Sequence, residues 1–179
     1  MARNRALQQW RVEDSVELYG INSWGAGYFD VSDKGDVVIC PHGPRGPQVS
    51  IPEIIAGLHE RGYDMPVLLR VENILDARIA NIHDSFRKAI KNLNYTGSYR
   101  GVFPVKVNQQ QQVVEKITQF GAKYHHGLEV GSKAELIAAI SLMTDRKACV
   151  ICNGYKDEEF IDLGLQALRL GFNVFFVLE

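Results

Sequence analysis

From residue 101 onward the chain repeats one pattern, an apolar strand, a short polar loop and a helix. The strand-like segments begin about 20 to 26 residues apart and read GVFPVKV, HGLEV, ACVIC and NVFFVL. Helical periodicity fills the intervals over residues 110–120, 133–142 and 157–170. Regular alternation of strand and helix builds a parallel sheet, either doubly wound or closed as a (β/α)8 barrel. The predicted fold class is therefore α/β.

The residues before the repeat follow other patterns. Two strand-like runs surround a Ser-Asp-Lys-Gly-Asp turn within residues 27–40, which predicts a β-hairpin. Ser50 and Glu53 have the spacing of a capping box, which predicts a helix ending near Gly62. Residues 66–70 are strand-like, and residues 73–93 predict a long amphipathic helix. The apolar positions of that helix are Ile74, Ile79, Ile82, Phe86, Ile90 and Leu93.

The repeat ends with its fourth strand at Glu179, which makes half of a barrel. Half a barrel leaves apolar strand edges open, and natural proteins avoid such edges. We therefore expect this sequence to be the N-terminal part of a longer protein, truncated after about four barrel strands.

Composition excludes several classes of partner. Lys and Arg number 20 against 21 Asp and Glu, so no overall basic field is available to hold nucleic acid or an anionic membrane. No stretch approaches the roughly 20 apolar residues that cross a bilayer, and the first residues lack the apolar core of a signal peptide. We expect a cytoplasmic protein with neither nucleic-acid nor membrane partners.

Lys106 stands out because it lies inside an apolar run. Removing an ammonium group from water costs several kcal/mol, so the position needs a reason. Strand parity places Val102, Pro104, Lys106 and Asn108 on one face. If the opposite, bulkier face meets the helices, Lys106 points into the barrel near the carboxyl end of its strand, where barrel enzymes keep their chemistry. Pro104 lacks an amide hydrogen, so we expect a local irregularity there.

The other strands also end in polar side chains, namely Glu129, Asn153 and Glu179. Because parallel strands end at the same edge, these groups should converge with Lys106. A desolvated lysine is a usable nucleophile toward a carbonyl group. The pattern therefore indicates Schiff-base chemistry, with a substrate carbonyl or with pyridoxal phosphate.

Two other motifs carry weaker signals. Cys149 and Cys152 form a C-x-x-C pair, but they lie on a predicted strand and point to opposite faces, so we interpret them as core residues. Three cysteines leave no disulfide framework. His125 and His126 are adjacent at a strand entrance and also face opposite ways, which makes a poor metal pair. No metal-ligating residue is predicted.

Four segments together resemble one enzyme family, the biosynthetic arginine decarboxylases, which are fold-type III pyridoxal-phosphate enzymes related to alanine racemase. The segments are WGAGYFDV (24–31), FPVKVNQ (103–109), GLEVGSKAEL (127–136) and VICNGYKDEEFI (150–161). The resemblance implies a β-rich domain to which residues 1–49 contribute a hairpin. It also implies a (β/α)8 barrel for pyridoxal phosphate that begins with residues 50–179.

The resemblance also implies roles for single residues. Lys106 matches the lysine that forms the Schiff base with the cofactor, and Glu129 matches an acidic position near that lysine. Asn108 is a candidate cofactor-binding residue on the same face. Glu135 has a structural explanation of its own, because Ser132 and Glu135 form a capping box.

The implied reaction is pyridoxal-phosphate-dependent decarboxylation of L-arginine to agmatine and CO2, in polyamine and spermidine biosynthesis. Alternatives are another fold-type III decarboxylase, acting on diaminopimelate or ornithine, or a non-catalytic pyridoxal-phosphate-binding protein. A homologue without chemistry that serves as a protein partner is disfavoured by Lys106. The resemblance also implies a homo-oligomer and a requirement for Mg²⁺, because enzymes of this family are described with both. These two expectations rest on the resemblance alone. The remaining substrate-binding and phosphate-binding residues are expected beyond Glu179, and the 179-residue chain alone is expected to be inactive.

Overall fold

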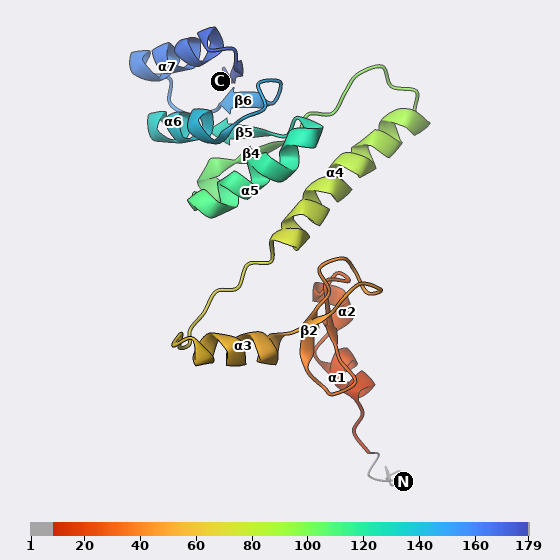
Figure 1. Cartoon of the computed structure of the whole chain (residues 1–179). Helices are drawn as coiled ribbons and strands as arrows, with labels where there is room; N and C mark the ends of the chain where they lie inside the picture. The colour runs from red at the N-terminus through yellow and green to blue at the C-terminus, as the bar shows by residue number, and fades with distance from the viewer. Residues whose placement is uncertain (1–8, 179) are drawn as a thin grey trace, which may run out of the picture. The chain divides into compact units, whose positions relative to one another are not determined.

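A computed structural model describes residues 9–178, which divide into one compact unit up to Ile74 and another from Leu75 onward. Figure 1 shows the elements of both units. The division falls after the predicted boundary at residues 49/50, because the helix that begins at Ile51 packs on the strands before it. The domain limits of a complete protein remain a prediction.

The N-terminal unit is a small antiparallel sheet with short helices. Its elements are α1 (Val12–Leu18), α2 (Ile21–Trp24), β1 (Phe29–Val31), β2 (Val37–Ile39), β3 (Val49–Ser50) and α3 (Ile51–Glu60). The strand order is β1-β2-β3, and β1 with β2 forms the predicted hairpin. The Ser50 hydroxyl accepts a hydrogen bond from the Glu53 amide at 3.3 Å, which caps α3 as the sequence predicts.

The C-terminal unit carries the strand–helix repeat. Its elements are α4 (Glu72–Asn92), whose first residues precede the division after Ile74, β4 (Val102–Pro104), η1 (Val105–Val107), α5 (Gln111–Gly121), η2 (Ala122–Tyr124), β5 (Gly127–Val130), α6 (Lys133–Leu142), β6 (Cys149–Cys152), α7 (Glu158–Arg169) and β7 (Asn173–Phe176). The strands form a parallel sheet in the order β4-β5-β6-β7. The α/β fold class is thereby confirmed.

One face of the parallel sheet is covered by helices. Leu128 and Val150 are aligned in register and fully buried. They belong to one hydrophobic core with Val114 of α5, Leu136 of α6 and Phe160 of α7. Burial of large side chains of this kind contributes about 1.5–3 kcal/mol each. This face therefore supplies most of the packing that holds the strands in place.

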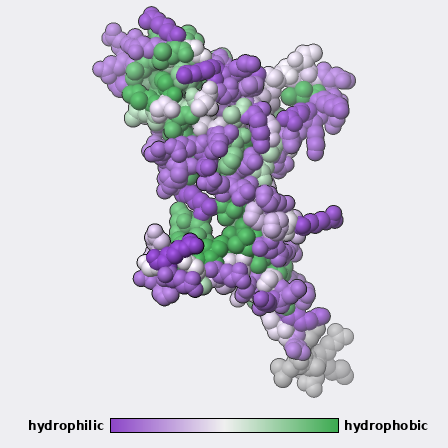
Figure 2. Space-filling view, in the orientation of Figure 1, coloured by the Kyte–Doolittle hydropathy of each residue, from purple (hydrophilic) through white to green (hydrophobic). Residues whose placement is uncertain are grey.

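The opposite face of the sheet is more open. Glu129, Ile151 and Phe175 are aligned across β5, β6 and β7, and none of them belongs to the core cluster. Phe175 is 49% exposed. Figure 2 shows hydrophobic residues also at the surface of the region where Figure 1 places α6 and α7, the helices of the covered face. Parallel sheets are normally covered on both faces, so this one presents apolar surface that the described residues leave uncovered.

The first parallel strand is shorter than predicted. β4 ends at Pro104, and the following residues form the 3₁₀ helix η1. Proline has no amide hydrogen to continue the ladder, so the expected irregularity is a change from strand to turn. Lys106 is therefore not in the strand, but in the turn directly after it. The prediction of Lys106 as a buried strand residue is wrong, although its place at the carboxyl end of the strand is confirmed.

Two further elements differ from their predicted form. Residues 66–70 are not a strand, because they are exposed and pair with no strand of the described residues. The long helix α4 is confirmed, but its buried side chains are Ile79 and His83, whereas Phe86 is 47% exposed. Across residues 9–178, no helix has the length and apolarity needed to cross a membrane.

Candidate active site

The carboxyl end of the parallel sheet brings Lys106 and Glu129 together. Lys106 Nζ lies 3.1 Å from Glu129 Oε1. The side chain of Lys106 is 60% exposed and that of Glu129 is 17% exposed. The 3₁₀ turn after Pro104 carries the lysine, while Glu129 lies on β5, paired in register with Pro104. The two residues thus meet because neighbouring parallel strands end at the same edge.

Asn153 joins this pair from the third strand. Its side-chain Nδ2 donates a hydrogen bond to Glu129 Oε1 at 3.3 Å. The residue follows β6 directly, and its backbone amide donates to the Val130 carbonyl at 2.8 Å. Lysine, carboxylate and amide therefore come from the ends of β4, β5 and β6. The convergence predicted for Lys106, Glu129 and Asn153 is present in the structure, while Glu179, the fourth predicted member, lies outside the described residues.

Two other lysines at this edge already have strong partners. Lys133 Nζ contacts Asp157 Oδ2 at 2.9 Å and Glu159 Oε2 at 2.6 Å, which connects the first turns of α6 and α7. Lys156 Nζ donates to the Gly154 carbonyl at 2.6 Å. Of these three lysines, Lys106 is the one whose ammonium lies at the open face with Glu129.

Glu135 connects two loops at the same edge. Its Oε2 accepts a hydrogen bond from the Gly131 amide at 2.6 Å, and its Oε1 accepts one from Gln109 Nε2 at 2.8 Å. The Glu135 amide donates to the Ser132 hydroxyl at 3.2 Å, so the predicted capping interaction is present. The tether through Gln109 could not be found from the sequence, since it joins residues of different loops.

Asn108 has a local structural role. Its Oδ1 accepts a hydrogen bond from the Gln110 amide at 3.1 Å, just before α5 begins. Asparagine commonly closes turns in this way. This bond occupies the side chain at the loop after Lys106, and its role toward a cofactor stays a prediction.

Sequence reasoning missed a histidine pair at the amino end of the sheet. His83 Nε2 and His126 Nδ1 lie 2.9 Å apart, and the His83 ring stacks on Tyr124 with centroids 4.6 Å apart. Burial, with the charge of His83 as a smaller cause, lowers the pKa of His126 to about 4. Burial also lowers the pKa of His83. The available signal was the position of His83, one helical turn after the buried Ile79.

The cysteines are core residues, as predicted. Cys149 and Cys152 are buried and free, and so is Cys40. Burial raises the pKa of Cys152 to about 11. Because the thiolate is the reactive form, this strand offers neither a redox pair nor a nucleophile. The adjacent histidines also diverge as predicted, since His125 Nδ1 contacts Asp145 Oδ2 at 2.7 Å and His126 contacts His83.

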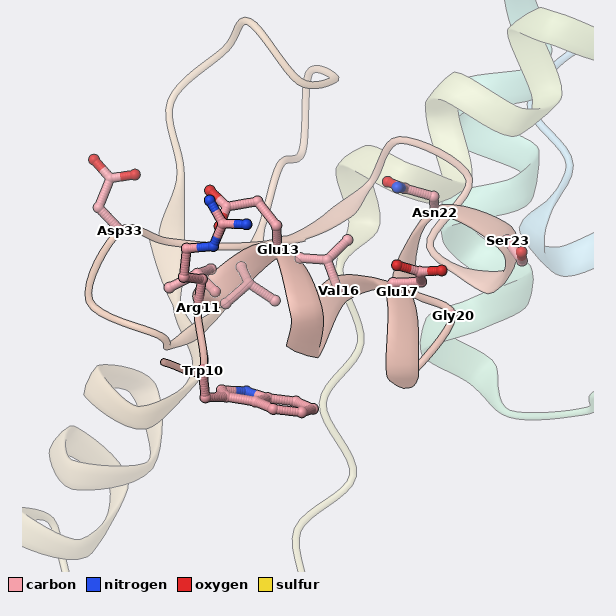
Figure 3. A pocket seen from close by; sticks show the side chains of 11 residues that line it. Trp10, Arg11, Glu13, Val16, Glu17, Gly20, Asn22, Ser23 and Asp33 are labelled. Carbon is pink, nitrogen blue, oxygen red and sulfur yellow. The ribbon is translucent and has the colours of Figure 1, made fainter. Parts of the chain in front are cut away.

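The N-terminal unit contains a cavity of about 910 Å³. Figure 3 shows its lining side chains, which come from α1, α2 and the residues around β1. Polar groups beside it already serve the start of α1, since the Trp10 indole donates to the Ser15 hydroxyl at 2.8 Å and the Arg11 amide to Asp14 Oδ2 at 2.8 Å. None of the predicted site residues lines this cavity. We therefore assign the chemistry to the edge of the parallel sheet.

Within residues 9–178, no three His, Cys, Asp or Glu side chains gather in a way that could hold a metal ion. These residues thus offer no dedicated carboxylate site for Mg²⁺.

Comparison with known proteins identifies a shared domain. Residues 78–173 match the sequence model of a family described as "Pyridoxal-dependent decarboxylase, pyridoxal binding domain". Similar curated proteins are named biosynthetic arginine decarboxylase. The one from Gloeobacter violaceus is 44% identical over 173 residues, which are 97% of this chain and 27% of that protein. The one from Pelobacter propionicus is also 44% identical over 173 residues, with the same shares.

A solved structure agrees with these matches. The crystal structure of the biosynthetic arginine decarboxylase SpeA from Campylobacter jejuni superposes with a TM-score of 0.83 at 36% identity. The match covers 90% of this chain and 27% of that chain. The present chain thus spans about 27% of the length of these relatives. The matched family region contains Lys106, Glu129 and Asn153.

Proposed function

The chain belongs to the pyridoxal-dependent decarboxylase family, through the pyridoxal-binding domain at residues 78–173, and from this premise we propose that the complete protein decarboxylates L-arginine to agmatine and CO2. The supporting observation is the pairing of Lys106 with Glu129 at the carboxyl end of the parallel sheet. The names of the similar proteins support arginine as the substrate. Agmatine would then feed polyamine and spermidine biosynthesis.

The residues present fit pyridoxal phosphate on chemical grounds. The cofactor is an aldehyde, so its covalent attachment needs a primary amine that can be reached. Lys106 offers an exposed amine at the edge where barrel enzymes bind their ligands. When bound, the cofactor draws electrons from the substrate carbon that loses CO2.

The chain's own residues have separate tasks in this proposal. Lys106 would hold the cofactor covalently through its ε-amine. Glu129 Oε1 lies 3.1 Å from Lys106 Nζ, so its carboxylate would accept the proton that the ammonium group has to lose before the amine can bond to the cofactor. Asn108, which closes the turn after Lys106, would fix the loop on the cofactor side of the site.

The attachment of the cofactor can be tested by chemical trapping. The complete natural protein is incubated with pyridoxal phosphate, reduced with borohydride, digested and mapped by mass spectrometry. We expect the label on the peptide that contains Lys106 and a loss of arginine turnover to background in Lys106→Ala. Lys123 and Lys133 are the internal controls, since each contacts an acidic partner as Lys106 does, but neither contacts Glu129. Label on either of them in place of Lys106 would contradict the assignment.

Substrate choice is tested on the same protein. Release of CO2 is measured with arginine, ornithine and diaminopimelate, and we expect turnover with arginine to dominate. Preference for ornithine or diaminopimelate would identify a sister decarboxylase. Label at Lys106 without CO2 from any of the three would identify a protein that binds the cofactor without catalysis.

Three further expectations belong to the complete protein and stay proposals. We propose homo-oligomerisation and a cytoplasmic location, the second supported by three free cysteines, which are typical of reducing compartments. The proposed Mg²⁺ requirement finds no matching site in residues 9–178, so no step of the reaction is assigned to a metal.

A further inference from the structure

We propose that Asn153 is a positioning residue, which orients the Glu129 carboxylate for its contact with Lys106. The inference rests on the proposed function, because it concerns the same lysine. It adds a residue from a third strand to the site. Asn153 itself is not assigned any contact with the cofactor or the substrate.

The first argument is the sharing of one oxygen atom. Glu129 Oε1 accepts from Asn153 Nδ2 at 3.3 Å and also lies 3.1 Å from Lys106 Nζ. A carboxylate oxygen has about two lone-pair directions, so these two donors fill Oε1. With both directions occupied, rotation of the carboxylate about its terminal bond would break at least one contact. The Asn153 amide thus restrains the plane in which the Glu129 carboxylate faces the lysine.

The second argument is the rigidity of the Asn153 backbone. Its amide continues the β5–β6 ladder by donating to the Val130 carbonyl at 2.8 Å. The next residue, Gly154, packs so closely on Gly131 that a side chain there would overlap the Gly131 carbonyl. Lys156 Nζ also holds the Gly154 carbonyl at 2.6 Å. Asparagine has a short side chain, and on such a backbone its Cα position is fixed. A group that positions another side chain needs both properties.

The third argument is the chemistry of an amide beside an ion pair. Lys106 is 60% exposed and carries a long side chain, so the pair alone leaves the carboxylate free to turn toward water. A carboxylate at position 153 would repel Glu129, and an ammonium group there would compete with Lys106. A neutral donor orients Glu129 without changing the charge of the pair. Asparagine meets this requirement and aspartate does not.

The experiment combines two variants at this position with one at Glu129, in the complete natural protein. Asn153→Ala removes the donor, and Asn153→Asp keeps the shape while replacing the donor with a charge. Each is measured for kcat and KM with arginine, for the rate at which pyridoxal phosphate becomes trapped at Lys106 by borohydride, and for melting temperature. We expect Asn153→Ala to lower kcat about 10-fold, as for loss of a hydrogen bond to a charged group, with a smaller change in KM. Asn153→Asp should lower it further.

The decisive comparison is the double variant. If Asn153 acts through Glu129, then Asn153→Ala should change neither kcat nor the trapping rate further in a Glu129→Gln background. Equal losses in both backgrounds, or a matching fall in melting temperature, would overturn the inference. So would unchanged kcat and trapping in Asn153→Ala.

The matched control is Asn173→Ala. Asn173 begins β7 at the opposite end of the same sheet, and its Nδ2 lies 3.5 Å from the Lys147 carbonyl. We expect parent-like kcat and trapping there, and a loss equal to that of Asn153→Ala would overturn the inference. If the parent protein does not turn over arginine, the proposal of arginine as substrate is wrong. The inference about Asn153 is then tested by the trapping rate alone. The two failures are therefore distinguishable.

Discussion

At the scale of single residues, the Lys106–Glu129 contact contributes little to folding. One partner is 60% exposed and the other 17% exposed. Pairs with an exposed partner are worth about 0–1 kcal/mol, because water screens the charges and the long side chain loses freedom. The contribution of this contact to the stability of the fold is thus too small to explain why the two residues are paired. A role of the pair in chemistry agrees with this.

Glu129→Gln separates the two roles, because it keeps the size of the side chain and deletes its charge. We expect the free energy of unfolding to change by less than about 1 kcal/mol. Decarboxylation should fall about 100-fold, within the usual range for loss of a proton-handling group. Turnover and thermal melting of the complete protein measure the two effects. Glu115→Gln on α5, whose carboxylate contacts Gln111, is the control; a large loss of stability in Glu129→Gln with turnover retained would assign Glu129 a structural role.

The position of Lys106 shows what the sequence could predict about this site. The parallel order of the strands predicted that Lys106 and Glu129 lie at one edge of the sheet, whereas the alternation of side chains along a strand does not apply to Lys106, which lies in the turn after β4. The sequence could not predict that the chain leaves the strand at Pro104, because the conformation after a proline depends on the residues that pack around it. It also could not predict the Gln109–Glu135 contact, which depends on the distance between two loops.

At the scale of elements, α4 is held beside the sheet through a histidine and aromatic cluster. His83 on α4 is 5% exposed and contacts His126, which precedes β5. Phe86 stacks on Tyr99 with centroids 3.8 Å apart. Periodicity predicted the helix correctly but placed Phe86 and Leu93 on its buried side, because apolar spacing alone does not show which flank meets the sheet.

This cluster makes the attachment of α4 dependent on pH. Burial lowers the pKa of His126 to about 4 and that of His83 below its ordinary value, so the folded state favours both neutral rings. Stability from the pair is fully present above the unfolded pKa of about 6.5 and is lost as the pH falls toward 4. We expect a loss of about 1–2 kcal/mol by pH 4.5, reduced from the full shift because part of the His126 ring meets water.

Urea unfolding of the complete protein at several pH values measures this loss. The charged groups around the pair are Asp84, Arg87 and Arg100. His126→Asn should flatten the dependence on pH. His59→Gln, at an exposed histidine of α3, should leave it unchanged. Equal pH dependence in His126→Asn and the parent would contradict the assignment.

At the scale of the whole molecule, the described residues cover only one of the two faces of the parallel sheet. The core lies between the sheet and α5, α6 and α7. The other face carries the Glu129 side chain and the half-exposed Phe175. The proposed site thus lies on an open surface, where water weakens every electrostatic interaction.

We expect the 179-residue chain by itself to release no agmatine from arginine. An uncovered face leaves Lys106 in contact with water, and the site lacks the enclosure that strengthens charge interactions in enzymes. The measurement compares agmatine formation by the purified chain and by the complete natural protein, with pyridoxal phosphate and Mg²⁺ supplied to both. Comparable turnover by the two would contradict this view of the open face.

Lys106, Glu129 and Asn153 lie on or directly after three consecutive strands, which also has a consequence for folding. Glu129 and Asn153 are 24 residues apart in sequence, and Lys106 precedes Glu129 by a similar interval. The entropic cost of closing a loop grows slowly with its length, and short-range contacts form quickly. The three side chains therefore meet once β4, β5 and β6 have paired, without waiting for distant segments. We therefore expect this group to assemble together with its own strands during folding.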